Sequence, residues 1–173
     1  EEMKRLMKAT LDWPHPIYIR LAKGGDAFVS FEEKEFTIGK AIVIKNPKDC
    51  LFVTTGVMTQ VALQACNILN QENISCGVMH MHTIKPLDNE ALNHWIPKVK
   101  SVVSVEEHTR IGGLGSAVLE FCSDAMPEQA SKIKRIGFPD RFADQYGNQN
   151  SLLNHWGITA EKLSETMRNS LNN

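Results

Sequence analysis

Two carboxylates and an imidazole stand next to one another at Glu106, Glu107 and His108, directly after the apolar run 101–105. Side chains of these types can exchange protons with a substrate, so the trio could act as an acid–base set. They could also line an interface or support a neighbouring site, and we favour this second interpretation. No serine nucleophile in an elbow pattern, P-loop lysine motif or Cys–His pairing completes a catalytic set in this sequence.

A group of glycines follows the trio in the pattern Gly112-Gly113-x-Gly115. It superficially resembles a dinucleotide-binding loop, but that loop has the spacing G-x-G-x-x-G after the first strand of its domain, whereas this one follows a late strand. Arg135 and Ile136 stand where an acidic ribose partner would be expected. We therefore expect the glycines to let a helix approach the sheet closely rather than to bind a cofactor.

Two other polar segments fall at the ends of apolar runs. Thr54-Thr55-Gly56 precedes a predicted helix whose free N–H groups could hold an anion, although an ordinary capped turn is the interpretation we favour. His80 and His82 alternate along a predicted strand, so both imidazoles could face one metal ion. No third ligand is evident nearby, and the sequence therefore predicts no metal site.

Strands and helices alternate along most of the chain, and this order must position the polar groups. The apolar runs that predict strands are residues 41–45, 51–55, 74–81, 101–105 and 133–138. The predicted helices are residues 57–71, 88–96 with Asp88 as the cap, 112–125, 151–156 and 160–171 with Thr159 as the cap. This alternation is typical of a three-layer α/β/α fold with a mostly parallel five-stranded sheet.

The first strand is expected to be the one antiparallel member of that sheet. Only residues 46–49 join the strand at 41–45 to the strand at 51–55. A parallel crossover needs a dozen or more residues. We therefore expect a hairpin, which leaves the first strand antiparallel to its neighbours or at an edge of the sheet.

The beginning of the chain does not fit this alternation. Residues 1–13 predict a helix with one apolar face, ended by Pro14 and Pro16, and residues 17–19 predict a short strand. Residues 26–40 are charged and lack a helical period, so they predict a linker. One helix and one strand cannot bury a core of their own. Together with the missing initiator Met, this leads us to expect that the chain begins inside a longer gene product.

The composition is that of one globular domain and argues against several classes of partner. Hydrophobic residues make up 42%, charged residues 23%, and the formal net charge is -1. No basic excess points to nucleic acid, and no apolar run is long enough to cross a membrane. The four cysteines have apolar neighbours and no C-x-x-C spacing, which predicts buried free thiols. No signal-peptide core follows the charged start, so we expect a cytoplasmic protein.

Three segments, taken in order, resemble the carboxy-terminal domain of the transketolase family. They are TTGVMTQVALQACNILNQENISCGVMHMHTIKPLD, SVVSVEEHTRIGGLGSAVLE and RIGFPDRFADQYGNQNSLLNHWGIT, which with their flanks cover residues 41–170. Upstream, HPIYIRLAKGG looks like the last strand of the pyrimidine-binding domain in the same family. The resemblance implies that residues 1–25 are the terminal helix and strand of that domain, residues 26–40 a linker, and residues 41–173 the transketolase carboxy-terminal domain.

The resemblance also implies a cofactor that this chain does not hold by itself. Enzymes of the family bind thiamine diphosphate and magnesium between two other domains, through a Gly-Asp-Gly loop and an activating Glu. The Gly24-Gly25-Asp26 turn does not match that loop. We therefore expect this portion to be inactive alone, to serve dimer packing and to border the substrate channel. Its expected partners are an amino-terminal thiamine-binding subunit or domain and further copies of the chain.

One substrate contact follows from the resemblance. In transketolases and deoxyxylulose-phosphate synthases, an Arg at the end of the pyrimidine-domain strand contacts the substrate phosphate, and Arg20 occupies that position. A guanidinium suits such a contact because it can bind a phosphate through two N–H groups. Lys23 stands where the synthases tend to have a second basic residue. A plain surface charge is the alternative for Arg20.

Several parents remain open at this point. We prefer the carboxy-terminal subunit of a split prokaryotic transketolase, truncated at its amino end, which would help transfer a two-carbon ketol unit between sugar phosphates. A 1-deoxyxylulose-5-phosphate synthase or a 2-oxoacid dehydrogenase beta subunit is the alternative parent. A free-standing binding or regulatory module is the non-catalytic alternative. The helix and strand at 1–20 argue against that module, because they would expose one apolar face.

Overall fold

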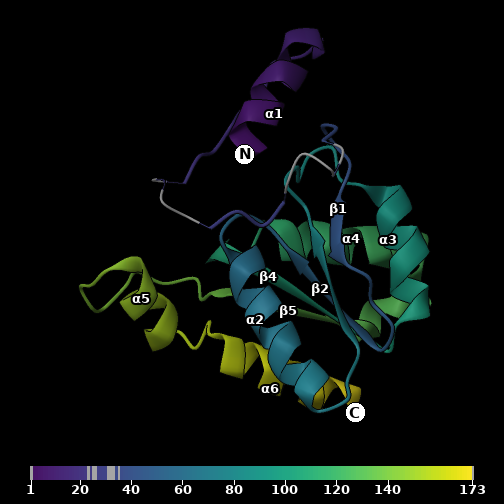
Figure 1. Ribbon diagram of the computed structural model, residues 1–173, viewed down its shortest axis with the longest axis vertical. Coiled ribbons are helices and arrows are strands. Elements are labelled where there is room, and N and C mark those ends of the chain that lie inside the picture. The colour runs from purple at the N-terminus through teal and green to yellow at the C-terminus, as the bar shows by residue number, and fades with distance from the viewer. Residues whose placement is uncertain (1, 23, 25–26, 31–33, 35, 173) are drawn as a thin grey trace.

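A five-stranded sheet forms the centre of the molecule, in the order β1-β3-β2-β4-β5 (Figure 1). The structure is a computed structural model that describes residues 2–22, 24, 27–30, 34 and 36–172. The strands are β1 (Ile42–Lys45), β2 (Cys50–Thr54), β3 (Cys76–His80), β4 (Ser101–Thr109) and β5 (Ile133–Phe138). β1 is antiparallel to β3, and the other pairs are parallel. The predicted sheet, mostly parallel with one antiparallel strand, is confirmed.

Helices cover both faces of this sheet, which confirms the three-layer fold. α2 (Met58–Gln71) and α6 (Ala160–Leu171) pack on one face, and α3 (Asn89–Trp95) and α4 (Leu114–Ala125) on the other (Figure 1). The remaining helices are α1 (Glu2–Ala9), α5 (Gln149–His155) and the short 3-10 turns Thr10–Asp12, Ile96–Lys98 and Pro127–Lys132. The predicted caps are present: Asp88 accepts the N–H of Ala91, and Thr159 that of Lys162.

The apolar runs of the central strands are explained by burial on both faces. Every residue of β2 and β3 is buried. Because side chains alternate along a strand, Phe52 of β2 packs toward α2 and α6, whereas its neighbour Leu51 packs toward α3 and α4. All four cysteines are buried and free, as predicted.

The connection between β1 and β2 differs from the predicted hairpin. β1 is antiparallel and at the edge, but it pairs with β3 instead of β2. The short loop at 46–49 therefore passes over the end of β3, and Gly77 makes room for it. A Cβ on Gly77 would lie 2.4 Å from the backbone N of Pro47, which is far inside van der Waals contact. The hairpin prediction was wrong because a short loop can also cross one strand, so its length does not require that the two strands it joins are neighbours.

Two further expectations are corrected near the chain's polar residues. Residues 17–19 are described but form no strand, since no described residue offers them a partner strand. β4 continues to Thr109 instead of stopping at Val105, so the trio at 106–108 lies within the strand. Below, residues 13–22 are called the arm and residues 39–172 the body.

Candidate functional site

The order of strands reverses between β2 and β4, the two central neighbours of the sheet. β2 leads through α2 to β3 on one side, and β4 leads through α4 to β5 on the other. The helices α2 and α4 lie on opposite faces, so the chain diverges at the carboxyl ends of these strands. In open parallel sheets, such a point leaves a crevice in which ligands bind.

A cavity of about 960 Å³ lies at this point of divergence. The body contributes Thr55 and Gly56 after β2, and Glu107 and His108 at the end of β4. The arm contributes much of the opposite lining, including Tyr18, Ile19 and Arg20. The arm thus lies across the crevice, and segments far apart in the sequence share one site.

Arg20 and His108 are brought together at this cavity. Burial lowers the pKa of the His108 imidazole, and the positive charge of Arg20 lowers it further. A guanidinium and an imidazole that face one cavity favour an anionic ligand. Lys85, which also lines the cavity, adds a positive charge. The other predicted phosphate-binding residue, Lys23, lies outside the described residues.

Glu106, the first residue of the trio, does not line the cavity and is completely buried. Its two carboxylate oxygens accept the backbone N–H groups of Leu114 and Gly115, at 2.8 and 2.9 Å. These are free donors of the first turn of α4, so Glu106 closes the positive end of that helix. The structure therefore assigns it a structural task and separates it from Glu107 and His108.

The glycines of this segment are explained by the same contact. A Cβ on Gly113 would lie 1.8 Å from Oε2 of Glu106, and a Cβ on Gly115 would lie 2.6 Å from Oγ of Ser104 in β4. The expected close approach of helix and sheet is thus present at Gly115. Sequence reasoning missed the role of Gly113, although an acidic residue in an apolar strand just before a double glycine was a usable signal.

The helix ends on the two sides of the crevice are unequal. The amino end of α4 is neutralised by Glu106, whereas Val57, the residue before α2, provides no side-chain cap. The turn before α2 needs Gly56, whose φ is 55°. Of the two side chains in the predicted anion-binding segment, only Thr55 lines the cavity, because Thr54 is buried against Thr59. The expected ordinary turn has no side-chain cap.

Glu107 connects the cavity wall to the carboxy-terminal helices. Its carboxylate accepts a hydrogen bond from Nε2 of Gln149, the first residue of α5. His155 at the other end of α5 pairs with Asp144, 3.1 Å away. These contacts fix the loop that follows β5, so α5 is joined to the same edge of the sheet as the cavity.

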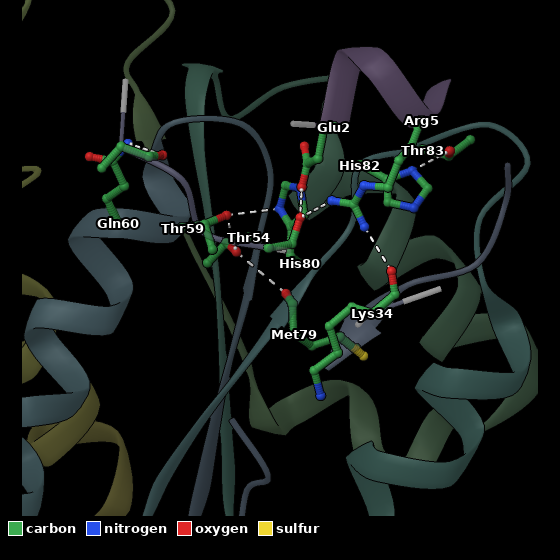
Figure 2. Close-up of polar contacts among 12 residues, drawn as sticks. Glu2, Arg5, Lys34, Thr54, Thr59, Gln60, Met79, His80, His82 and Thr83 are labelled. Carbon is green, nitrogen blue, oxygen red and sulfur yellow. Dashed lines mark hydrogen bonds and ion pairs between the residues drawn. The ribbon is translucent and has the colours of Figure 1, made fainter. Parts of the chain in front are cut away.

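His80 and His82 do not converge on a metal ion. His80 is buried, with Thr59 on one ring nitrogen and Glu2 near the other (Figure 2). His82 stacks on Phe36, with the ring centroids 4.1 Å apart. Within the part of the chain that the structure describes, no three His, Cys, Asp or Glu side chains are placed to hold a metal ion. The contact between Glu2 and His80 was not anticipated from the sequence, because it joins segments far apart in the chain.

The comparison with protein families decides what kind of domain this is. Residues 39–163 match the family described as "Transketolase, C-terminal domain". The chain belongs to the transketolase carboxy-terminal domain family. The predicted resemblance is therefore confirmed for the body.

Relatives of this transketolase domain include components of two-part enzymes. The chain is 30% identical over 167 residues to an apulose-4-phosphate transketolase subunit of Phocaeicola vulgatus, covering 95% of this chain and 52% of that protein. It is 34% identical over 148 residues to a 6-deoxy-6-sulfo-D-fructose transketolase subunit of a Clostridium species, covering 86% and 45%. It is also 30% identical over 169 residues to a 1-deoxy-D-xylulose-5-phosphate synthase of Heliobacterium modesticaldum, covering 96% and 26%.

Solved transketolase structures share the fold. A split-gene transketolase in an inactive beta4 tetramer superposes with a TM-score of 0.88 at 33% identity, over 98% of this chain and 54% of that one. A transketolase of Pichia stipitis superposes with a TM-score of 0.56 at 16% identity, over 78% and 18%, and this shows the fold alone. The chain spans about half or less of the length of these relatives.

The cavity of this transketolase domain is a poor fit for a magnesium-bound diphosphate. Magnesium on a diphosphate is held by carboxylate and carbonyl oxygens, whereas the described lining offers positive side chains and one carboxylate, that of Glu107. It can therefore meet an anionic group of a substrate but does not build a metal site. No helix among the described residues is long and apolar enough to cross a membrane.

Proposed function

We propose that this chain is the carboxy-terminal part of a thiamine-diphosphate-dependent transketolase that transfers a two-carbon ketol unit between sugar phosphates. The observation that carries the proposal is Arg20 on the arm, which lines the cavity together with His108 at the divergence of β2 and β4. Two relatives named as transketolase subunits, and a split-gene transketolase structure, support a two-subunit parent. Thiamine diphosphate and magnesium would be held by the rest of that enzyme.

In this proposal, Arg20 binds the phosphate of the substrate. Its guanidinium can donate two hydrogen bonds to one phosphate, and the imidazole of His108 and the N–H groups at the start of α2 can add to them. The body then forms one side of the substrate channel, and its remaining surface serves packing in an oligomer. The chain alone transfers nothing, because the residues for the chemical step belong to its partner subunit or preceding domain.

The arm and α1 belong, in the same proposal, to the end of a preceding pyrimidine-binding domain. Large apolar side chains of the arm and of the turn between α1 and the arm are exposed: Leu11 of that turn is 84% and Tyr18 of the arm 87% accessible. Isolated exposed apolar residues are common, but a series along one segment marks a surface that another part covers. Residues 1–25 would be covered by that domain, with the segment 26–40 as the linker to the body.

A 1-deoxyxylulose-5-phosphate synthase is the second candidate parent. The observation that favours it is the match to the Heliobacterium modesticaldum synthase, which is as high in identity as the match to the Phocaeicola vulgatus protein. Both reactions use a phosphorylated substrate, so Arg20 would have the same task in either enzyme. The donor differs: a ketose phosphate in one case and pyruvate in the other.

The test is an assay of the chain extended at its amino terminus to the length of its relatives and mixed with a thiamine-binding subunit. We expect ketol transfer between sugar phosphates by the pair and none by either component. Arg20→Ala should raise the KM for the phosphorylated substrate by roughly 10 to 100-fold with little change in kcat, since a uniform binding contact is lost.

Arg168→Ala is the matched control. Arg168 pairs with a carboxylate, that of Glu72 at 2.9 Å, and it lies on α6 outside the cavity lining. Its removal should leave KM unchanged. Condensation of pyruvate with a triose phosphate by the pair, without ketol transfer, would assign the synthase instead. An Arg20→Ala enzyme with wild-type KM in both assays contradicts the phosphate contact.

A further inference from the structure

A buried polar contact outside the cavity joins α1 to the body (Figure 2). Nε2 of His80 lies 2.9 Å from Oε1 of Glu2, the first described residue of the chain. His80 ends β3 and is 1% exposed, while the Glu2 side chain is 31% exposed. The imidazole therefore cannot reach solvent, and Glu2 is the charged group that faces its outer nitrogen.

The ring of His80 is fixed from behind by two buried hydroxyls. Nδ1 lies 2.8 Å from Oγ1 of Thr59, which lies 2.9 Å from Oγ1 of Thr54. A hydroxyl can donate to a neutral Nδ1 or accept from a protonated one. When Thr59 donates to Nδ1, or when both ring nitrogens are protonated, Nε2 carries a hydrogen on the side of Glu2. The carboxylate of Glu2 lies at ion-pair distance from Nε2, although the two groups do not have hydrogen-bond geometry.

The carboxylate–imidazole–hydroxyl order is that of a hydrolase triad, but the geometry does not support this chemistry. A nucleophile must meet its substrate, and Thr59 is fully buried at the start of α2. Its hydroxyl is also bonded to Thr54. The three groups therefore hold one another in place and do not attack a ligand.

A second residue of α1 reinforces the contact. Arg5 is one turn from Glu2 and lies on the same face of the helix. Its Nη2 donates to Oγ of Ser30 at 2.7 Å, and Ser30 in turn donates to Oε1 of Glu2 at 2.8 Å. Nη1 donates to the carbonyl of Lys34 at 2.7 Å (Figure 2). Burial raises the pKa of Glu2, but the contact with His80 and its charge, the hydrogen bond from Ser30 and the charge of His82 outweigh burial and lower the pKa to about 2.

The arm lies between this contact and another attachment further along the chain. After the arm, the carbonyl of Ala27 accepts a hydrogen bond from Nε2 of Gln60 on α2, at 3.1 Å. Between the two points, the arm crosses the cavity and carries Arg20 to His108. The described arm makes no strand pairing there, so its attachments determine where Arg20 stands.

We propose that Glu2, His80 and Thr59 act together as a pin, whose task is to position the arm across the cavity. If α1 moves away, the buried imidazole of His80 loses the carboxylate that lies 2.9 Å from its Nε2, and the loss of this charged neighbour makes the displaced state costly. The three residues do not touch a ligand and act through Arg20. This last step rests on the proposed function, whereas the attachment of the arm does not.

Hydrogen–deuterium exchange of the arm tests the pin directly. We expect Glu2→Ala to speed exchange of the arm amides by about fivefold, which corresponds to the loss of one partly buried ion-pair contact. Glu2→Gln keeps an acceptor for Nε2 of His80 and should give a smaller increase. Glu72→Ala is the matched control, because Glu72 forms an ion pair of the same 2.9 Å length with Arg168. Unchanged exchange of the arm in Glu2→Ala would overturn the pin.

Kinetics of the assembled enzyme test the step from the pin to Arg20. Glu2→Ala should raise the KM for the phosphorylated substrate about fivefold and leave kcat unchanged. It should add nothing to the effect of Arg20→Ala, since both act through one contact. An additive effect would overturn the positioning role. If Arg20→Ala itself leaves KM unchanged, the phosphate contact fails, and the exchange experiment still decides whether the pin exists.

Discussion

The body and the arm differ in how far the described chain buries their side chains and pairs their polar groups. In the body, even a buried carboxylate finds its donors within a few residues, as Glu106 does with the first turn of α4. In the arm and α1, no described residue is fully buried, and Leu11 and Tyr18 are almost fully exposed. The described part of that region reaches into the body through the carboxylate of Glu2 on His80.

This difference shows that the two segments depend on different neighbours for their burial. The body has the buried strands and capped helices of a unit that stabilises itself. The arm has an apolar sequence without the neighbours that would cover it, and polar groups that attach it to the body at defined points. In the proposed function, a preceding domain supplies the contacts that the arm does not find in the body.

The largest effect on stability is expected at the buried contact between Glu106 and the first turn of α4. Glu106→Ala leaves buried N–H groups of α4 without an acceptor and should lower the free energy of unfolding by about 3 kcal/mol. Gly113→Ala should cost a similar ~3 kcal/mol, because its Cβ would collide with the same carboxylate. Glu106→Ala with Gly113→Ala together should cost no more than Glu106→Ala alone. Urea unfolding measures all three.

Glu107→Ala is the control for this cycle. Glu107 is the adjacent carboxylate and bonds the exposed amide of Gln149, so its loss should stay within ~0.5 kcal/mol. If the two costs of Glu106→Ala and Gly113→Ala add in the double variant, the carboxylate is not the group that requires the glycine.

A smaller loss of stability is expected where the loop between β1 and β2 crosses β3. Gly77→Ala should cost about 2 kcal/mol, because the loop at Pro47 must move away from β3. Gly112→Ala is the comparison, since its φ of 76° strains an alanine although no atom lies within 4 Å. It should cost only ~1 kcal/mol. Equal thermal unfolding midpoints for the two variants would show that the crossing over β3 is looser than described.

The pH dependence of stability probes the place where arm and body meet. Burial, together with the charge of His80, lowers the pKa of His82 from 6.5 to about 4. Between pH 6.5 and 4, His82 is therefore protonated in the unfolded chain but neutral in the folded chain. The free energy of unfolding should consequently fall as pH decreases over this range. The expected loss is on the order of 1 kcal/mol, after allowance for partial exposure.

His82→Gln should flatten this part of the pH profile, measured by urea unfolding at each pH. Glu2 contributes a second decline below it, because its carboxylate has a lowered pKa of about 2 and is protonated first in the unfolded chain. A profile that keeps its slope between pH 6.5 and 4 in His82→Gln would place the responsible group elsewhere.

The smallest effect is expected in the arm region. Leu11→Ser should change the stability of this chain by less than ~0.5 kcal/mol, since the side chain is 84% exposed. In the chain extended at its amino terminus, the same change should cost about 1 to 2 kcal/mol, because the preceding domain would bury Leu11. Equal costs in both proteins, measured by differential scanning calorimetry, would argue against that domain.

Sequence patterns predicted the body well because its signals are local. Apolar strands buried on both faces, the caps at Asp88 and Thr159 and the alternation of elements all follow from neighbouring residues. The pairing of β1 with β3 was missed because it depends on which strand the loop at 46–49 passes, a choice settled by Gly77 in a distant segment.

The site was only partly predictable for the same reason. The trio at 106–108 was singled out, but its division into one buried and two cavity-facing residues depends on the length of β4 and on the glycines that follow. The pairing of Arg20 with His108 and of Glu2 with His80 joins residues that no sequence period relates. The strand predicted at 17–19 failed because a strand needs a partner, which the described chain does not provide.

The carboxylate of Glu106, which comes from the sheet, is a permanent internal counterion for the amino end of α4. Where related architectures recruit a phosphate from solution to the end of a helix, this chain supplies the negative charge covalently. The amino end of α4 is therefore satisfied at any phosphate concentration, and a charged ligand gains little by approaching that side. In the proposed function, recognition of a phosphate is therefore left to Arg20 on the arm, on the opposite side of the cavity.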